Sequence, residues 1–225
     1  SFSIFNFQFS IVMNTIGRLY TLTSFGESHG EALGGVIDGC PAGIPLSEEE
    51  IQHELNRRRP GQSSVTTSRT EEDRVEILSG IFEGVTTGSP IGFIVRNKDQ
   101  RSRDYDAIKD LFRPSHADYT MQEKYGVRDY RGGGRSSARE HVVRVVGGAV
   151  ARQVLKRLGV SIYGYTSQVG PIALKESYHE FNLEETENNV VRCPDSVVAR
   201  EMELFIRKVQ EEHDSVGGVV SCVIR

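Results

Sequence analysis

Two Ser-x-x-Glu sequences, at 47–50 and 137–140, restrict where helices can begin in this chain. In such a capping box the serine hydroxyl accepts from the N–H three residues later, and the glutamate side chain accepts from the N–H of the serine. The first box predicts a helix from Ser47 to about Arg58, just before a Pro-Gly pair. The second predicts a helix that begins at Ser137 and that Gly159 ends.

Runs of β-branched and aromatic residues predict several short strands around these helices. Two more helices are expected, one closed by Gly126 and one that begins after Pro194. Because helices and strands mix without a steady βαβ rhythm, we expect an α+β fold rather than a doubly wound sheet. The expected strands cover residues 17–24, 33–37, 74–80, 91–96, 160–169 and 217–224, and the two further helices cover 116–125 and about 194–212.

The chain is rich in glycine, with 23 glycines in 225 residues. Three of them, 132–134, lie just before the helix that begins at Ser137, and two more, Gly147-Gly148, lie inside it. A glycine inside a helix costs about 1 kcal/mol relative to alanine. We therefore expect another backbone to pack closely against Gly147-Gly148.

Composition excludes several classes of protein. Hydrophobic residues make up 37% and charged residues 26% of the chain, and no stretch approaches the roughly 18 apolar residues of a membrane span, so we expect no membrane association. The formal net charge of −4 disfavours a general nucleic-acid binder. Three widely spaced cysteines without a C-x-x-C pair suit a reducing cytosol, which predicts a cytoplasmic protein without a structural zinc site.

Both ends of the chain are unusual. Residues 1–12 hold no charge, lead directly into Met13 and show neither signal-peptide nor transit-peptide features, so we expect a non-native or disordered extension. Residues 217–224 form an apolar β-type run, and we expect such a strand to need a partner from outside this chain. We therefore expect residues 13–225 to be the N-terminal part of a single, C-terminally truncated domain.

Positive charge gathers around the start of the second predicted helix. Residues 130–158 hold seven cations against one glutamate, a local charge of +6, whereas residues 175–187 carry −4. Arg135 and Arg139 lie beside glycines and two serines, so free backbone N–H groups, the helix dipole and guanidinium groups together predict an anion site. The last three cations of this stretch fit a solvated helix face as well, and the arginines at 57–59 fit either a ligand site or a cationic helix end.

Two of the six histidines are candidates for acid–base chemistry. His29 lies between glycines in GESHG, and His116 lies in RPSHAD, next to Arg113. Both positions are in a loop or at a helix start, where acid–base residues are often placed, and imidazole titrates near neutral pH. His53, His179 and His213 lie among glutamates and are expected on the surface.

Several motif-based functions are excluded. GESHG matches the G-x-S-x-G nucleophile elbow, but strand and turn residues follow it instead of a helix, so a serine hydrolase is rejected. There is no Rossmann G-x-G-x-x-G, no Walker A sequence and no H-E-x-x-H. A phosphate- or nucleic-acid-binding module and a flavin-dependent redox protein stay open as alternatives to a non-redox enzyme.

Six segments together closely resemble the chorismate synthase family, over about residues 13–225. They are longer and more specific than any of the short motifs above. The segments are GESHGEALGGVIDG (26–39), RRRPG (57–61), TTG (86–88), DQRSRDYD (99–106), RPSHAD (113–118) and YRGGGRSSARE (130–140).

The resemblance implies a fold, a reaction and a cofactor. The fold would be a β-α-β sandwich, usually assembled as a homotetramer. Enzymes of this family are lyases of the shikimate pathway, which leads to the aromatic amino acids. They convert 5-enolpyruvylshikimate 3-phosphate to chorismate and phosphate by a 1,4-elimination that needs reduced FMN without net redox change. NADPH is the reductant in some members.

The resemblance also implies roles for individual residues. His29 would protonate the departing phosphate with support from Ser28, and His116 would keep the reduced flavin in its correct protonation state. Ser137 would also be catalytic. The residues implied to bind substrate are Arg58, Arg113, Ala138 and Arg139, and those implied to contact FMN are Arg135, Ser136 and Ser137.

The chain departs from the family pattern in two ways. His141 stands where the family normally has Thr or Ser, and its ring is expected to crowd the site. The family's C-terminal Arg-Ser-Asp and Lys-Pro-Thr segments, which complete the flavin pocket, are absent from this sequence. We therefore expect these 225 residues alone to be inactive or weakly folded. Residues 62–70 and 98–106 are the expected lid loops.

Overall fold

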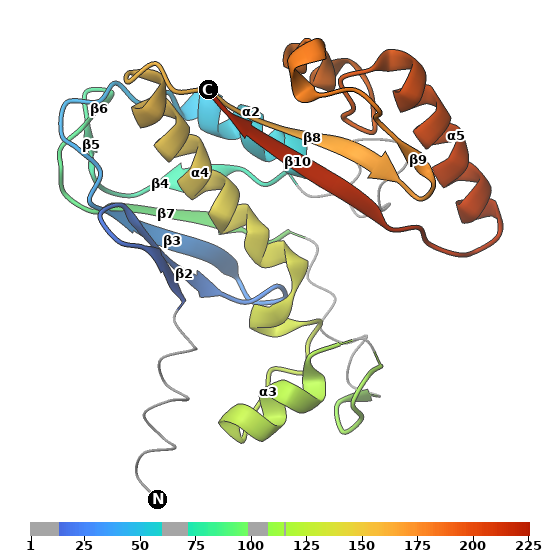
Figure 1. Cartoon of the computed structure of the whole chain (residues 1–225). Coiled ribbons are helices and arrows are strands. Elements are labelled where there is room, and N and C mark those ends of the chain that lie inside the picture. Colours follow the sequence, from blue (N-terminus) through green and yellow to red (C-terminus); the bar gives the residue numbers. More distant parts are fainter. Residues whose placement is uncertain (1–13, 60–71, 99–107, 115) are drawn as a thin grey trace, which may run out of the picture. The chain divides into compact units, whose positions relative to one another are not determined.

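The computed structural model describes residues 14–59, 72–98, 108–114 and 116–225. The predicted extension at 1–12 and nearly all of the predicted lid loops lie outside the described residues. The described chain divides into two compact units, the first ending at Val154 and the second running from Leu155 to Arg225 (Figure 1). All the candidate site residues belong to the first unit.

The first unit is built on a five-stranded antiparallel sheet with the strand order β1-β2-β3-β7-β4. The tight β2–β3 connection carries the GESHG turn. A separate two-stranded hairpin consists of β5 and β6. The strands are β1 (Thr15–Gly17), β2 (Thr21–Gly26), β3 (Ala32–Asp38), β4 (Val75–Ile77), β5 (Ile81–Phe82), β6 (Val85–Thr86) and β7 (Ile91–Arg96).

The expected single strand at 17–24 is wrong, because the chain turns back between Gly17 and Thr21 to pair β1 with β2. Gly17 has a φ of +97°, and a Cβ there would lie 2.0 Å from the Tyr20 carbonyl oxygen. Only glycine fits such a turn. Local strand propensity alone does not show the reversal.

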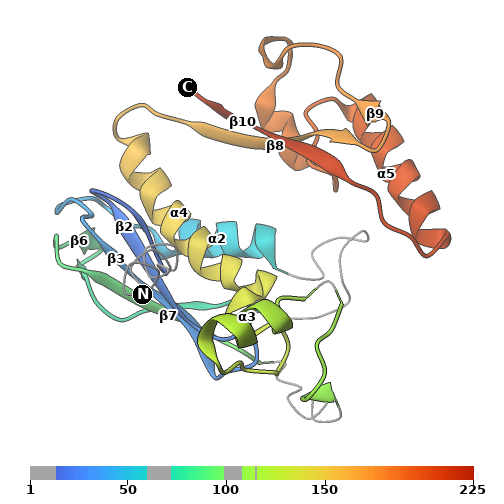
Figure 2. The same cartoon turned by 60° about the horizontal axis from the view of Figure 1, so that its bottom comes forward.

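Helices α2 (Glu48–Arg58) and α4 (His141–Lys156) cover one face of this sheet (Figures 1 and 2). Fully buried apolar side chains from both helices meet those of the central strands in one core. The core includes Leu33 and Ile37 of β3, Phe93 and Val95 of β7, Ile51 and Leu55 of α2, and Val142, Val146 and Val150 of α4.

The first capping box is confirmed at its serine: Ser47 Oγ accepts from the Glu50 N–H at 3.1 Å. The second is only half right. Ser137 caps a 3₁₀ turn (Ala138–Glu140) that leads into α4, but the Glu140 carboxylate accepts from Ser24 Oγ at 2.8 Å. Glu140 therefore connects α4 to the sheet instead of completing its own cap.

The first unit is completed by α3 (Asp118–Tyr125) and the 3₁₀ turn Gly134–Ser136. As predicted, Gly126 ends α3 in the left-handed conformation and donates to the Gln122 carbonyl at 2.8 Å.

The second unit is a three-stranded antiparallel sheet, ordered β10-β8-β9, with helix α5. Helix α5 begins after Pro194, as expected, and Asp195 caps it. The terminal strand β10 pairs with β8 along its whole length, so the expectation that it has no partner in this chain is wrong. The elements are β8 (Ile162–Val169), β9 (Ile172–Ala173), β10 (Gly218–Ile224), α5 (Ser196–Glu211) and the 3₁₀ turns Tyr178–Glu180 and Leu183–Asn188.

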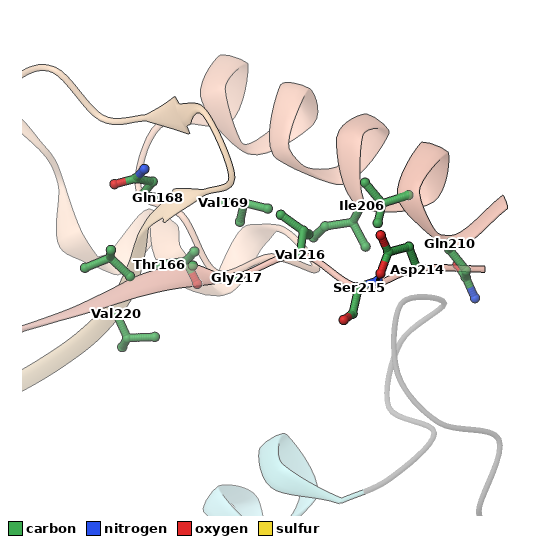
Figure 3. A pocket seen from close by; sticks show the side chains of 13 residues that line it. Thr166, Gln168, Val169, Ile206, Gln210, Asp214, Ser215, Val216, Gly217 and Val220 are labelled. Carbon is green, nitrogen blue, oxygen red and sulfur yellow. Dashed lines mark hydrogen bonds between the residues drawn. The ribbon is translucent and has the colours of Figure 1, made fainter. Parts of the chain in front are cut away.

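A cavity of about 510 Å³ in the second unit is lined by β8, β10, the last turns of α5 and the segment between α5 and β10 (Figure 3). Of the described residues that line it, only Asp214 is ionisable. These lining residues therefore present no cation to an anionic ligand.

Among the described residues, none of the helices is both long and apolar enough to cross a membrane.

The two glycines inside α4 have different surroundings, and the expected close backbone is found at neither. A Cβ at Gly147 would lie 2.8 Å from the Leu22 side chain, whereas a Cβ at Gly148 would meet nothing within 4 Å.

We expect Gly148→Ala to stabilise the protein by about 1 kcal/mol, since it only restores helix propensity. Gly147→Ala should be less stable than Gly148→Ala by about 1–3 kcal/mol because of overpacking. Urea unfolding checks both, and equal stabilities would contradict the packing described.

Candidate active site

The β2–β3 turn places Ser28 and His29 inside the first unit. The turn closes with the Gly30 N–H donating to the Glu27 carbonyl at 3.1 Å. Ser28 is 1% exposed and His29 is 8% exposed. Ser28 Oγ is buried and has no hydrogen-bond partner among the described residues. A buried hydroxyl in this state is costly unless a ligand or water satisfies it, which is typical of a binding site.

The glycine-rich segment, residues 132–134, passes directly over this turn. Gly132 has a φ of +65°, and a Cβ there would lie 2.3 Å from His29 Cδ2 and 3.1 Å from Ser28 Oγ. Arg113 donates to the Gly132 carbonyl and so holds the segment in place. The glycine thus brings backbone into contact with His29 and Ser28, two of the predicted catalytic residues.

Arg113 is itself fixed by a carboxylate. Its Nε and Nη2 donate to the two oxygens of Asp118, at 2.8 and 2.9 Å, at the first residue of α3. These hydrogen bonds lower the pKa of Asp118 from 3.8 to about 2, although burial opposes the shift. The pair orients Arg113 toward the glycine-rich segment.

Two arginines distant in the sequence meet on one buried carboxylate. Asp73 is 1% exposed and accepts from Arg58 Nη1 at 3.0 Å and from Arg139 Nη1 at 2.7 Å. Arg58 also donates to the carbonyl of Ala138, at 3.2 Å. The predicted substrate-binding residues 58, 138 and 139 therefore lie together.

Asn97, just after β7, joins this arginine pair to the histidine turn. Its Oδ1 accepts from Arg139 Nε at 2.7 Å, and its Nδ2 donates to the carbonyls of Glu27 and Gly30 at 3.1 and 2.8 Å. Those two carbonyls bracket Ser28 and His29.

The residues expected to contact FMN have mixed surroundings. Arg135 donates to the Gly26 carbonyl at 3.0 Å and to Ser24 Oγ at 2.7 Å, so it binds the end of β2. Ser136 is exposed and donates to the Gly133 carbonyl at 2.6 Å. Ser137 is half-buried, and its hydroxyl accepts from the Arg139 N–H.

The other two histidines near these segments are exposed. His116 Nδ1 lies 3.0 Å from the Pro114 carbonyl. His141 Nδ1 lies 3.0 Å from the Ala138 carbonyl at the start of α4. His141 is exposed, but the carbonyl that it contacts belongs to a predicted substrate-binding residue, so the crowding of the site stays a prediction.

A small cavity of about 140 Å³ adjoins the glycine-rich segment. Gly133, Gly134, Arg135 and Ser136 line it together with Arg128, three carboxylates and three apolar residues. The carboxylates are Glu27, Asp118 and Asp129, and the apolar residues are Ala117, Met121 and Val127. Ligand pockets usually measure about 300–1,000 Å³. The cavity formed by the described residues is therefore smaller than a usual ligand pocket.

The cations of the basic stretch are largely paired. Arg131 binds Asp129 at 2.7 Å, Arg144 binds Glu140 at 3.0 Å, and Arg152 binds Glu54 at 2.6 Å. This pairing neutralises charge that a nucleic-acid surface would need, and it shows that Arg152 is not simply solvated.

A family model described as chorismate synthase matches residues 20–225. The chain belongs to the chorismate synthase family. It is 62% identical over 214 residues to the chorismate synthase of Phocaeicola vulgatus and 61% identical over 213 residues to that of Parabacteroides distasonis. Each match covers 95% of this chain and 60% of the relative. The chain therefore spans about 60% of the length of the curated relatives it matches.

A solved structure described as a crystal structure of chorismate synthase superposes with a TM-score of 0.74 at 33% identity. The match covers 92% of this chain and 58% of the other. The predicted α+β fold of the chorismate synthase type is thereby confirmed. Of the implied site residues, the fold brings together Ser28, His29, Arg58, Arg113, Ala138 and Arg139 through the contacts above.

The residues that hold this site together carry little signal in the sequence. Asp73 lies in a charged run that looks solvated, and Asn97 follows a strand without any motif of its own. Asp118 belongs to the RPSHAD segment, and its place five residues after Arg113 is the available signal. No spacing rule connects Asp73 or Asn97 to the arginines they bind, because those contacts are long-range.

We expect Gly132→Ala to disturb the site far more than Gly134→Ala. Both glycines have a positive φ, but a Cβ at Gly134 would have its nearest contact at 3.5 Å. Overpacking should therefore lower the free energy of unfolding of Gly132→Ala by about 1–3 kcal/mol more than that of Gly134→Ala. NMR should show the His29 ring signals shifted only in Gly132→Ala. Equal effects of the two substitutions would disprove the close contact.

We expect the Asp118–Arg113 pair to make stability depend on acid pH. A carboxyl whose pKa is lower in the folded than in the unfolded state stabilises the folded protein at pH values above its unfolded pKa of about 4. This stabilisation is lost as the pH falls toward the folded pKa of about 2. Asp118→Asn should lower the free energy of unfolding by about 1–2 kcal/mol at pH about 6. The gap between the free energies of unfolding of wild type and variant should narrow as the pH falls. Urea unfolding across pH measures the gap, and a constant gap would contradict this assignment.

Proposed function

We propose that the protein containing this chain is a lyase that converts 5-enolpyruvylshikimate 3-phosphate to chorismate and phosphate. One observation carries the proposal. Ser28 and His29 are buried under Gly132 and are connected through Asn97 to a pair of arginines. A proton donor beside clustered guanidinium groups suits the loss of a phosphate group. Membership of the chorismate synthase family supports the same reaction.

The arginines would bind the anionic groups of the substrate, which carries a phosphate and two carboxylates. Arg58 and Arg139 lie on one carboxylate, and Arg113 holds the segment over His29. Guanidinium groups bind phosphate and carboxylate oxygens in bidentate fashion. An alkyl phosphate is a poor leaving group unless its charge is neutralised, and buried cations stabilise that charge strongly.

His29 would donate a proton to the departing phosphate, and Ser28 Oγ would hydrogen-bond to it. The burial of both side chains excludes competing water and strengthens each polar contact.

The described residues fit part of an FMN site. The Ser136 and Ser137 hydroxyls and the Arg135 guanidinium suit a phosphate or polar ring edge, whereas the 140 Å³ cavity is too small for the whole molecule. When bound, reduced FMN would supply electron density as the C–O bond breaks. In this proposal Arg135, Ser136 and Ser137 hold the flavin, and His116 maintains the protonation state of the flavin. Ser137 also positions Arg139, because its hydroxyl accepts from the Arg139 backbone N–H.

The finer features of the family belong to the same proposal. We propose a cytoplasmic enzyme of aromatic amino-acid biosynthesis that forms a homotetramer when full length. Its partner is the small-molecule substrate, with neither nucleic acid nor membrane involved. NADPH serves as reductant if this enzyme reduces its own flavin. A flavin-dependent redox protein would instead consume a nicotinamide in proportion to product.

The deciding experiment adds 5-enolpyruvylshikimate 3-phosphate to the complete gene product with photoreduced FMN under anaerobic conditions. Chorismate absorbance should appear in many turnovers without consumption of nicotinamide. Formation of product in proportion to oxidised nicotinamide would favour the redox alternative, and no product would refute the lyase.

In that assay, His29→Ala should lower kcat by about 10²–10⁴, the usual contribution of a general acid. His53→Ala is the matched control, because His53 is an exposed histidine on α2. It should leave kcat unchanged. If His29→Ala retains full kcat, the assignment of His29 as the proton donor is wrong.

A further inference from the structure

Asp73 and Asn97 lie at the centre of the candidate active site without being any of the residues expected to bind or protonate substrate. The Asp73 side chain is fully buried between Arg58 and Arg139. Asn97 is 8% exposed and contacts both Arg139 and the turn that carries His29. These contacts form one continuous chain from α2 to the β2–β3 turn.

We propose that Asp73 and Asn97 are positioning residues: Asp73 sets the spacing of Arg58 and Arg139, and Asn97 fixes that pair relative to Ser28 and His29. The inference rests on the proposed function, in which the arginines bind substrate anions and His29 donates the proton. It concerns how the two parts of the site are held at a fixed distance from each other.

Electrostatics explains why a carboxylate is needed at Asp73. Two guanidinium cations that approach the same point repel each other, and the repulsion is strong where water is excluded. The Asp73 carboxylate, at 3.0 and 2.7 Å from the two arginines, offsets that repulsion with one oxygen for each. A neutral amide of the same shape could accept from only one of them.

The backbone around Asp73 is held as firmly as its side chain. Asp73 has a φ of +47°, a left-handed conformation that aspartate adopts more readily than most residues. Gln52 of α2 donates to the Asp73 carbonyl at 3.2 Å and accepts from the Val75 N–H at 3.2 Å. One glutamine therefore fixes this bend, so the carboxylate has a defined position.

Asn97 uses both ends of its side-chain amide. Its oxygen accepts from Arg139, and its nitrogen donates to the carbonyls of Glu27 and Gly30, while its backbone N–H donates to Glu31 at 3.0 Å. A carboxylate at this position would keep the arginine contact but would face two carbonyl oxygens without a proton. The arrangement therefore requires an amide, and Asn97→Asp breaks the link to the turn while it keeps an acceptor for Arg139.

Fixing this distance matters for the reaction. A displacement of about 1 Å between a bound substrate and its catalytic group can lower the rate by about 10²-fold. The arginines locate the substrate, and the turn locates the His29 ring. Because Asn97 is the described side chain that contacts both, it should affect the chemical step more than the binding of substrate.

The test compares three variants of the complete gene product in the chorismate assay. Asn97→Asp should lower kcat by about 10–100-fold with KM within about twofold, as for other residues that orient a catalytic group. Asp73→Asn should raise KM by about 10-fold, because one arginine loses its acceptor and the spacing of the pair is no longer fixed. Glu54→Gln is the matched control: Glu54 also accepts from two arginines, Arg57 and Arg152, outside the candidate site. It should leave both constants within about twofold of wild type.

NMR of the histidine rings separates positioning from simple loss of folded protein. Unfolding reduces the intensity of every folded signal, whereas misplacement moves the His29 signals and leaves those of His53 in place. Asn97→Asp should therefore shift the His29 signals. Should Asn97→Asp fail to fold, Asn97→Ser, which removes both amide donors without adding charge, is measured instead with the same expected result.

The outcomes distinguish this inference from the proposed function. A wild-type protein that forms no chorismate refutes the proposed function, and the His29 signals still test the positioning. A wild-type protein that is active, together with an Asn97 variant that keeps kcat and the His29 signals, overturns the role of Asn97. An Asp73→Asn protein with an unchanged KM, or a Glu54→Gln protein with an equal rise in KM, overturns the role of Asp73.

Discussion

The ion pairs of Asp73 with Arg58 and Arg139 join three parts of the chain that are far apart in the sequence. Arg58 ends α2, Asp73 comes just before β4, and Arg139 lies in the turn that leads into α4. A buried charge is tolerated only when opposite charges and hydrogen bonds surround it. The end of α2, the start of α4 and the edge strand β4 are therefore held to one arrangement, and Asn97 extends it to the His29 turn.

Close packing made possible by glycine is the second constraint. Gly132 brings the glycine-rich segment against His29 and Ser28, and a Cβ at Gly35 would lie 2.8 Å from Val143 of α4. At Gly132 the absence of a side chain allows backbone to contact the site residues. At Gly35 it allows helix α4 to pack closely against the sheet. The packing that supports the fold and the packing that encloses the site thus use the same device.

Helix ends were the part of the fold most accessible from sequence, because caps are local. Ser47 and Gly126 each act within a few residues, and each was located correctly. The errors came where a distant partner decided the outcome. Glu140 bonds to Ser24 instead of Ser137, and β10 finds its partner in β8. Within the site, the motifs predicted the arginines, because guanidinium groups bind anions. They also predicted His29, because an imidazole can donate a proton near neutral pH.

The sequence by itself determined the family, the positions of most helices and strands, and the residues whose chemistry suits a phosphate-bearing substrate. These follow from local preferences and from long motifs within single segments. Only the tertiary structure decided that Arg58 and Arg139 share Asp73, that Asn97 connects them to the histidine turn, and that Ser28 is buried beside Gly132. The physical reason is that hydrogen bonds and ion pairs act over a few ångströms in space, whereas the residues that make them are separated by up to about a hundred positions along the chain.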